Sequence, residues 1–243
     1  IEDFGVYGEY VLDIGESISW QSILDYSSRN PDIFIYYYSS NHYTWDYDYL
    51  KSQVFSANTN LEFENIKLST GINTNLLQNY IVFNQESMPV QVAKLNFIAD
   101  AWLAKRFDFG KFHWLSKLSY QYIKDKNRIP LPDFVAYSSI YFQSPMFKKA
   151  MILQLGFDVK YFSKTYLYAY NPALSVFYLQ TDSKYGNYPN MAFNISVLIK
   201  RLRGFVRLSN FNSLMMSKNY FVSHKMPDNP FAFNFGISWE FYD

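Results

Sequence analysis

The sequence of 243 residues contains no cysteine. The chain therefore has no disulfide, no thiol nucleophile, no iron–sulfur cluster and no cysteine zinc site. Histidine is scarce too: His42, His113 and His224 are the only three, and none has a second ligand at metal-binding spacing. We expect no metal, no cofactor and no catalytic residue.

The chain also lacks an excess of charge of one sign, a phosphate-binding loop and a long apolar run. The chain has 22 Lys and Arg against 21 Asp and Glu, so no basic face for nucleic acid is expected. Neither GxxxxGK[ST] nor GxGxxG occurs. No run approaches the roughly 18 apolar residues of a membrane helix. If the chain lies in a membrane, it does so as a closed barrel, the other structure that satisfies its backbone in lipid.

Aromatic residues, by contrast, are abundant: they make up 21% of the chain, with 23 Tyr and 23 Phe. A transmembrane β-barrel places aromatics in two girdles at the membrane interfaces, on either side of an apolar band. A soluble β-rich domain with an aromatic core is the alternative that composition leaves open. The tyrosines of residues 36–49 would fit an interfacial girdle or, alternatively, a sugar-stacking track.

Residues 231–243, FAFNFGISWEFYD, show the clearest strand pattern, because large apolar side chains alternate with small or polar ones. An apolar-out, polar-in strand of about ten residues is what a transmembrane barrel needs. A terminal aromatic strand also resembles the C-terminal signal by which the barrel-assembly machinery recognises its substrates. The residues assigned to this insertion signal are Phe235, Ile237, Trp239, Phe241 and Tyr242.

The same alternation recurs at 93–107 and at 151–161. An amphipathic helix is the alternative at 93–107, which is rich in Ala, Leu and Lys. A helix needs apolar residues at i, i+3, i+4 and i+7, whereas here the polar residues Lys94, Asn96 and Asp100 fall on even positions and leave the odd ones apolar. The pattern therefore favours a strand.

These patterns predict an all-β fold: a transmembrane antiparallel up-and-down β-barrel of about fourteen strands, with twelve to sixteen defensible. Residues 33–38 are apolar on both faces, and residues 73–86 stay ambiguous, either a continuation of the preceding strand or a short hairpin about Gln78-Asn79. The last strands are expected at 134–143, 149–162, 172–181, 190–200, 202–212 and 231–242.

Outer-membrane barrels have short periplasmic turns and long extracellular loops, and the last four expected strands follow this pattern. A short turn is expected at Lys200–Arg201 and longer loops at 182–189 and 213–230. The loop at 124–132 is long for a periplasmic turn. Residues 1–243 are expected to form one barrel domain, and the strand pattern that begins by Phe4 suggests an upstream region outside this sequence.

Charged residues on the polar positions of the strands are the candidate channel lining. Facing a lumen, their mixed charges would hold water and set weak ion selectivity. They could equally pair and fill a closed interior, because a barrel of about eight strands is packed shut whereas one of 16–18 is open. The candidate lumen-facing residues are Lys94, Asp100, Arg106, Asp158, Lys160 and Glu240.

Several blocks in the second half of the chain resemble the putative porins of the Bacteroidetes. The matching blocks are GKFH at 110–113 with Gln121 and Leu131-Pro132, LQLGFDVKYF at 153–162, YNPA at 170–173, FYLQ at 177–180, GNYP at 186–189 and FGISWEFYD at 235–243. MPDNP at 226–230 departs from the pattern, where a Met-Pro-Gly-type turn with a basic residue is expected. The resemblance implies an outer-membrane barrel of a Gram-negative bacterium, and a chain that is the C-terminal barrel portion of a longer protein.

The function expected from these features is passive diffusion of small hydrophilic solutes through an outer-membrane porin. The first alternative is a non-conducting barrel that serves as a structural subunit of a larger outer-membrane complex. A weaker alternative is a barrel hydrolase built on His224 with Ser223 and Asp228. The expected partners are outer-membrane lipid, the barrel-assembly machinery and other outer-membrane proteins, with no nucleic acid.

Overall fold

The computed structural model describes residues 3–216 and 219–241. Almost all regular structure in these ranges is strand. The helical segments described are one turn of α-helix, α1 (Ile33–Tyr36), and two 3-10 turns, η1 (Glu64–Ile66) and η2 (Phe211–Leu214). None of them is long and apolar enough to cross a membrane.

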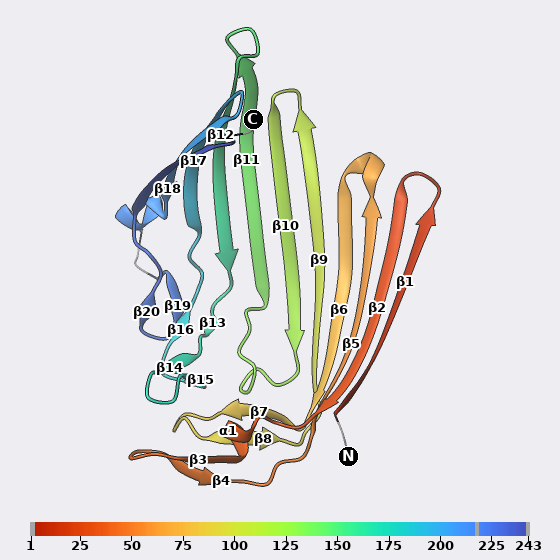
Figure 1. Ribbon diagram of the computed structural model, residues 1–243, viewed down its shortest axis with the longest axis vertical. Helices are drawn as coiled ribbons and strands as arrows, with labels where there is room; N and C mark the ends of the chain where they lie inside the picture. Colours follow the sequence, from red (N-terminus) through yellow and green to blue (C-terminus); the bar gives the residue numbers. More distant parts are fainter. Residues whose placement is uncertain (1–2, 217–218, 242–243) are drawn as a thin grey trace.

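Eleven long strands form a single sheet whose spatial order follows the chain (Figure 1). Every neighbouring pair is antiparallel. The predicted all-β, antiparallel, up-and-down arrangement is therefore confirmed. The strands are β1 (Phe4–Ile14), β2 (Ile18–Arg29), β5 (Ser52–Phe63), β6 (Leu68–Gln78), β9 (Asn96–Phe109), β10 (Phe112–Ile123), β11 (Phe134–Met146), β12 (Met151–Phe162), β17 (Asn190–Ile199), β18 (Leu202–Ser209) and β21 (Ala232–Trp239).

Short turns lie at one end of the sheet and long connections at the other, as Figure 1 shows. The short turns are residues 15–17, 64–67, 110–111, 147–150 and 200–201. The long connections are residues 30–51, 79–95, 124–133, 163–189 and 210–231. The connection at 124–133, which is long for a periplasmic turn, lies at the end of the sheet that carries the other long connections. We call these two ends the turn end and the loop end.

Within the residues that the structure describes, the sheet has eleven strands rather than about fourteen. Residues 33–38, 73–86 and 172–181, which the alternation left ambiguous or assigned to long strands, contribute mainly to small hairpins in the long connections. Several of their apolar residues are buried at the loop end, namely Tyr80, Val82, Leu174, Val176 and Leu179, and alternation alone does not distinguish this burial from burial in lipid. The hairpin strands are β3 (Tyr37–Ser39), β4 (Thr44–Asp46), β7 (Tyr80–Phe83), β8 (Pro89–Val92), β13 (Thr165–Tyr166), β14 (Ala169–Asn171), β15 (Val176–Tyr178), β16 (Lys184–Tyr185), β19 (Phe221–Ser223) and β20 (Met226–Pro227).

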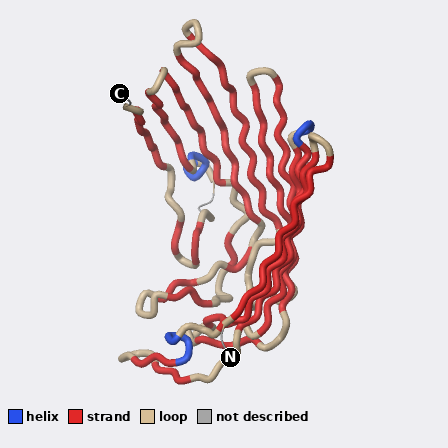
Figure 2. The backbone as a smooth tube through the Cα atoms, turned by 45° about the vertical axis from the view of Figure 1, so that its right-hand side comes forward, coloured by secondary structure: helices blue, strands red, loops and turns tan. Residues whose placement is uncertain are grey.

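The hairpins hold the buried hydrophobic clusters of the described residues. Trp45, Leu174 and Val176 form one cluster, and Tyr80, Val82 and Leu179 form a second. Residues from separate long connections meet in both clusters. The loop end is therefore a packed layer, and Figures 1 and 2 show hairpins crossing below the strands.

The sheet is curved but not closed within the described residues. In Figure 2 the first strands stand edge-on while the last strands are seen more nearly face-on. β1 and β21 are the two end strands, and each has one sheet neighbour in the part of the chain that the structure describes. Both run from the loop end to the turn end, because eleven alternating strands return the last to the direction of the first.

Candidate functional site

One face of the sheet is apolar across its whole width. On β17, Ile195 lies across from Leu155 on β12 and Val206 on β18, and Val206 lies across from Phe235 on β21. Exposed apolar residues on this face include Leu12, Trp20, Leu24, Phe55, Ile72, Leu103, Trp114, Leu118, Ile140, Phe233, Phe235 and Ile237. An antiparallel sheet in water normally packs such a face against a core. An exposed apolar surface of this extent is typical of membrane contact.

The opposite face, called here the polar face, carries polar side chains bonded across neighbouring strands. The pairs include Gln21 Nε2 with Glu9 Oε1 at 2.8 Å, Ser56 Oγ with Asn75 Oδ1 at 2.7 Å, Asn73 Nδ2 with Asp100 Oδ2 at 3.0 Å and Ser139 Oγ with Asp158 Oδ1 at 2.7 Å. These polar groups form hydrogen bonds with one another and are not covered by an apolar layer. This face therefore suits contact with water.

Two glycines on the polar face each lie beneath an aromatic ring of a neighbouring strand. A Cβ at Gly71 would lie 2.7 Å from Trp102 Nε1, and one at Gly236 would lie 2.5 Å from Phe205 Cε1. Each ring therefore occupies the space that another residue's Cβ would need. The close fit indicates that side chains crowd on the polar side of the curved sheet.

The candidate lumen-facing residues fall into three groups. Asp100, Arg106, Asp158 and Lys160 lie on strands, at positions of the polar face. Lys94 lies in the bend before β9, so it is not on the sheet, and its side chain is exposed. Glu240 follows the last residue of β21, and its backbone N–H donates to the Arg201 carbonyl at 3.3 Å.

Asp158 and Lys160 meet in a polar cavity of about 230 Å³ on β12, β17 and β18. The Asp158 carboxylate accepts from Ser139, from Asn194 Nδ2 at 2.7 Å and from Arg207 Nη1 at 3.4 Å. Arg207 was not among the predicted residues. Its position between Val206 and Leu208 in the alternation of β18 was a usable signal, because it sets Arg207 on the polar face.

A second charged cluster lies near the turn end, and Arg106 is its one member among the predicted residues. Asp108 on β9 pairs with Lys67, Arg106 and His113. Lys67 sits in the turn before β6 with φ 50°, and β6 is the sheet neighbour of β9. The register of two strands brings these groups together, and the sequence alone does not fix that register.

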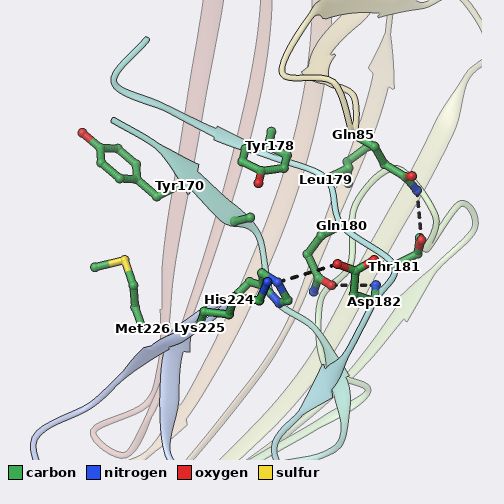
Figure 3. Close-up of a pocket in the computed structure, with 11 residues that line it drawn as sticks. Gln85, Tyr170, Tyr178, Leu179, Gln180, Thr181, Asp182, His224, Lys225 and Met226 are labelled. Carbon is green, nitrogen blue, oxygen red and sulfur yellow. Dashed lines mark hydrogen bonds and ion pairs between the residues drawn. The ribbon is translucent and has the colours of Figure 1, made fainter. Parts of the chain in front are cut away.

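A pocket of about 420 Å³ lies among the hairpins of the loop end (Figure 3). His224 lines it and is 8% exposed. His224 Nδ1 lies 3.0 Å from the Tyr185 hydroxyl, and its Nε2 lies 3.9 Å from Asp182 Oδ2. Gln85 Nε2 donates to Thr181 Oγ1 at 2.9 Å across the same pocket. These contacts tie three long connections to one another.

The geometry does not assemble the Ser223–His224–Asp228 group of a hydrolase. The Ser223 hydroxyl donates to the Tyr168 carbonyl, and the Asp228 carboxylate accepts from Asn190 Nδ2 at 3.4 Å. A serine nucleophile needs its hydroxyl bonded to the histidine that takes its proton. His224 has Tyr185 and Asp182 as its side-chain partners instead.

The residues assigned to the C-terminal insertion signal are partly on the last strand. Phe235, Ile237 and Trp239 alternate on the apolar face of β21, and Ile237 is 76% exposed. Phe241 follows the strand and is 79% exposed. Tyr242 lies outside the described residues.

Burial and hydrogen bonds shift the pKa of several ionisable groups that lie outside the long strands. Burial raises the pKa of Tyr49 to about 12, and its hydroxyl donates to the Pro89 carbonyl at 2.7 Å. Burial also raises the pKa of Tyr168 and of Tyr188. The backbone N–H of Asn30 and then the Lys51 ammonium lower the pKa of Asp3.

Among the residues that the structure describes, no group of three or more acidic and histidine side chains could hold a metal ion.

A curved antiparallel sheet with one exposed apolar face, one hydrogen-bonded polar face, short turns at one end and long loops at the other is the wall of an outer-membrane β-barrel. The chain belongs to the family described as Putative porin, whose model matches residues 1–243. Family and fold together assign it to the bacterial outer membrane.

Solved structures of outer-membrane barrels share the fold. The siderophore receptor PirA from Acinetobacter baumannii aligns with a TM-score of 0.63 at 10% identity over 98% of this chain. FpvA from P. aeruginosa, in a complex with a heterologous pyoverdine and iron, aligns with a TM-score of 0.53 at 12% identity over 97% of this chain. The chain spans 41% of the length of the PirA structure and 32% of that of FpvA. No curated protein matches the chain.

Proposed function

We propose that the protein is a passive diffusion channel for small hydrophilic solutes, with the polar face of the sheet as its water-filled lining. The observation that carries this proposal is the division of the sheet into two faces. Ile195, Leu155 and Val206 meet on the apolar face, while Asp158, Asn194 and Arg207 meet on the other. Mixed charges that hold water are a typical channel lining.

The proposed barrel includes strands beyond the eleven described. β1 and β21 run in the same direction, whereas an antiparallel barrel in a single bacterial chain has an even number of strands. An odd number of further strands between the two edges would let every pair be antiparallel. This chain spans 41% of the length of the PirA structure, so a protein of that length would have room for such strands.

Liposome swelling tests the proposal directly. Proteoliposomes that contain the full-length protein should swell in isosmotic arabinose and glucose, and swell progressively less in larger oligosaccharides. Empty liposomes and liposomes with heat-unfolded protein are the controls. Equal, background rates for all sugars, from protein verified as folded and inserted, would rule out passive diffusion.

A second candidate function, a non-conducting structural subunit, is favoured by the packed hairpin layer. Tyr80, Val82 and Leu179 are buried where hairpins from separate connections meet, and the layer crosses the loop end. Such a layer could block the mouth and present a fixed surface to another outer-membrane protein. Co-purification of a defined complex, lost when residues 213–230 are deleted from protein that still folds, would favour this function over diffusion.

Insertion is proposed to depend on the last strand. We assign Phe235, Ile237, Trp239, Phe241 and Tyr242 to recognition by the barrel-assembly machinery. The alternation of large apolar residues on β21 supports this assignment. The lipid of the outer membrane is then the partner of the apolar face.

A further inference from the structure

An apolar cavity of about 460 Å³ lies at the loop end, on the polar face of the sheet. One of its walls comes from the sheet, where Val135 on β11 and Phe162 on β12 lie across from each other. Another wall comes from the connection 210–231, through Phe221 and Val222 of β19. A water-filled lining has no need of such a cavity, so its apolar walls need a separate explanation.

The walls of the cavity are held in place by contacts outside it. The Tyr188 hydroxyl donates to Asn210 Oδ1 at 2.7 Å, and Tyr188 is 4% exposed. The ring of Phe221 packs on Tyr185 with centroids 4.6 Å apart. The backbone N–H of His224 donates to the Tyr168 carbonyl at 2.9 Å and fixes β19 to the connection 163–189. The cavity is therefore formed before any ligand arrives, which lowers the ordering cost of binding.

Lys160 is the charged group of this site without a partner among the described residues. The other cation nearby, Arg207, bonds to Asp158 and to Asn194 Oδ1 at 2.9 Å. The Asp228 carboxylate accepts from Asn190 Nδ2 and from the Asn229 backbone N–H at 2.8 Å. Lys160 lines both the apolar cavity and the polar cavity next to it, and its side chain is exposed.

We propose that the apolar cavity binds an amphiphilic carboxylate, an aromatic or aliphatic body with one anionic group. The body is buried between Val135, Phe162 and Val222, and the carboxylate pairs with the Lys160 ammonium at the junction of the two cavities. A neutral sugar would leave the apolar walls without a partner, and a fully apolar solute would leave Lys160 unpaired. This site goes beyond the proposed diffusion channel, because binding here does not require an open pore.

Isothermal titration calorimetry in lipid nanodiscs tests the proposal, with the heat from empty nanodiscs subtracted. The probes are 4-phenylbutyrate, 4-phenylbutan-1-ol, which lacks the charge, and butyrate, which lacks the ring. We expect 4-phenylbutyrate to bind with one site and at least about tenfold more tightly than either analogue, a difference of one decade in the dissociation constant. Equal binding of the carboxylate and the alcohol would overturn the proposal.

Variants localise the site. Lys160→Met should weaken 4-phenylbutyrate at least about tenfold while leaving the alcohol unchanged. Lys164→Met is the matched control, because Lys164 is also exposed but does not line either cavity. Val222→Asp adds an anion to the mouth at a side chain that is 62% exposed, so it should fold normally and reject the carboxylate. Unchanged affinity in both Lys160→Met and Val222→Asp would overturn the proposal, whatever the conductance of the protein.

Discussion

Ile195 on β17 lies directly across from Val206 on β18, while the adjacent Ser196 lies across from Phe205 on the other face. Successive residues of one strand therefore belong to the two different faces of the sheet. Ile195 also lies across from Leu155 on its other side, whereas Ser196 lies across from Gln154. Neither Gln154 nor Phe205 carries a charge.

The first prediction uses this pair. Ile195→Arg places a cation on the lipid-facing side of a central strand and should cost about 2–4 kcal/mol of unfolding free energy. Ser196→Arg places the same cation on the water-facing side and should cost much less. Denaturant unfolding of both variants in lipid vesicles measures the difference. Equal losses from the two neighbours would show that the faces are wrongly assigned.

The second prediction concerns crowding on the polar face. Gly71→Ala should destabilise the barrel by about 1–3 kcal/mol, because the new methyl group would meet Asn60 Oδ1, the Thr59 carbonyl and the Trp102 indole. Gly8→Ala is the control, since a Cβ there has no atom within 4 Å. The same vesicle assay applies, and a Gly71→Ala variant as stable as Gly8→Ala would contradict the crowded geometry.

The third prediction concerns ion selectivity. Asp158→Asn removes one anion and leaves Arg207 without its carboxylate partner, so the reversal potential in a salt gradient should shift toward anion preference. Arg207→Gln should shift it in the opposite direction. Asp13→Asn, in the first strand and far from this network, serves as a comparison of equal charge. Shifts of the same sign in the Asp158 and Arg207 variants would contradict a lining role for the pair.

The fourth prediction concerns alkaline pH. Because burial raises the pKa of Tyr49 to about 12, the folded state favours its neutral phenol. Its contribution to stability is therefore complete below pH about 10, the ordinary tyrosine pKa, and is lost as pH rises toward 12.

Carbon-13 NMR of labelled tyrosine measures this shift. The Tyr49 resonance, assigned by its absence in Tyr49→Phe, should titrate toward pH 12, well above the ordinary tyrosine pKa of about 10. A Tyr49 midpoint near the ordinary tyrosine pKa of about 10 would show that the hydroxyl is not buried against Pro89.

Strand faces could be predicted from the sequence because they depend on a local period of two residues. That period places Asp100, Arg106, Asp158 and Lys160 on the polar face without any knowledge of neighbouring strands. It fails at Lys94, because β9 begins only at Asn96 and alternation does not mark where pairing starts.

Strand number and the charged clusters could not be predicted in the same way. Val176 alternates like a membrane residue but is buried against Trp45 in the loop-end layer, a contact between segments far apart in the chain. The Asp108–Lys67 pair depends on the register of β6 with β9. Long-range contacts of both kinds are set by tertiary packing rather than by local pattern.

Planar-bilayer conductance of the full-length, detergent-purified protein tests the central claim most directly. A water-filled channel lined by the polar face predicts stepwise, ohmic openings whose ion selectivity changes in Asp158→Asn and Arg207→Gln. A protein shown to be folded and inserted that stays electrically silent would contradict the diffusion channel and leave the structural-subunit function in its place.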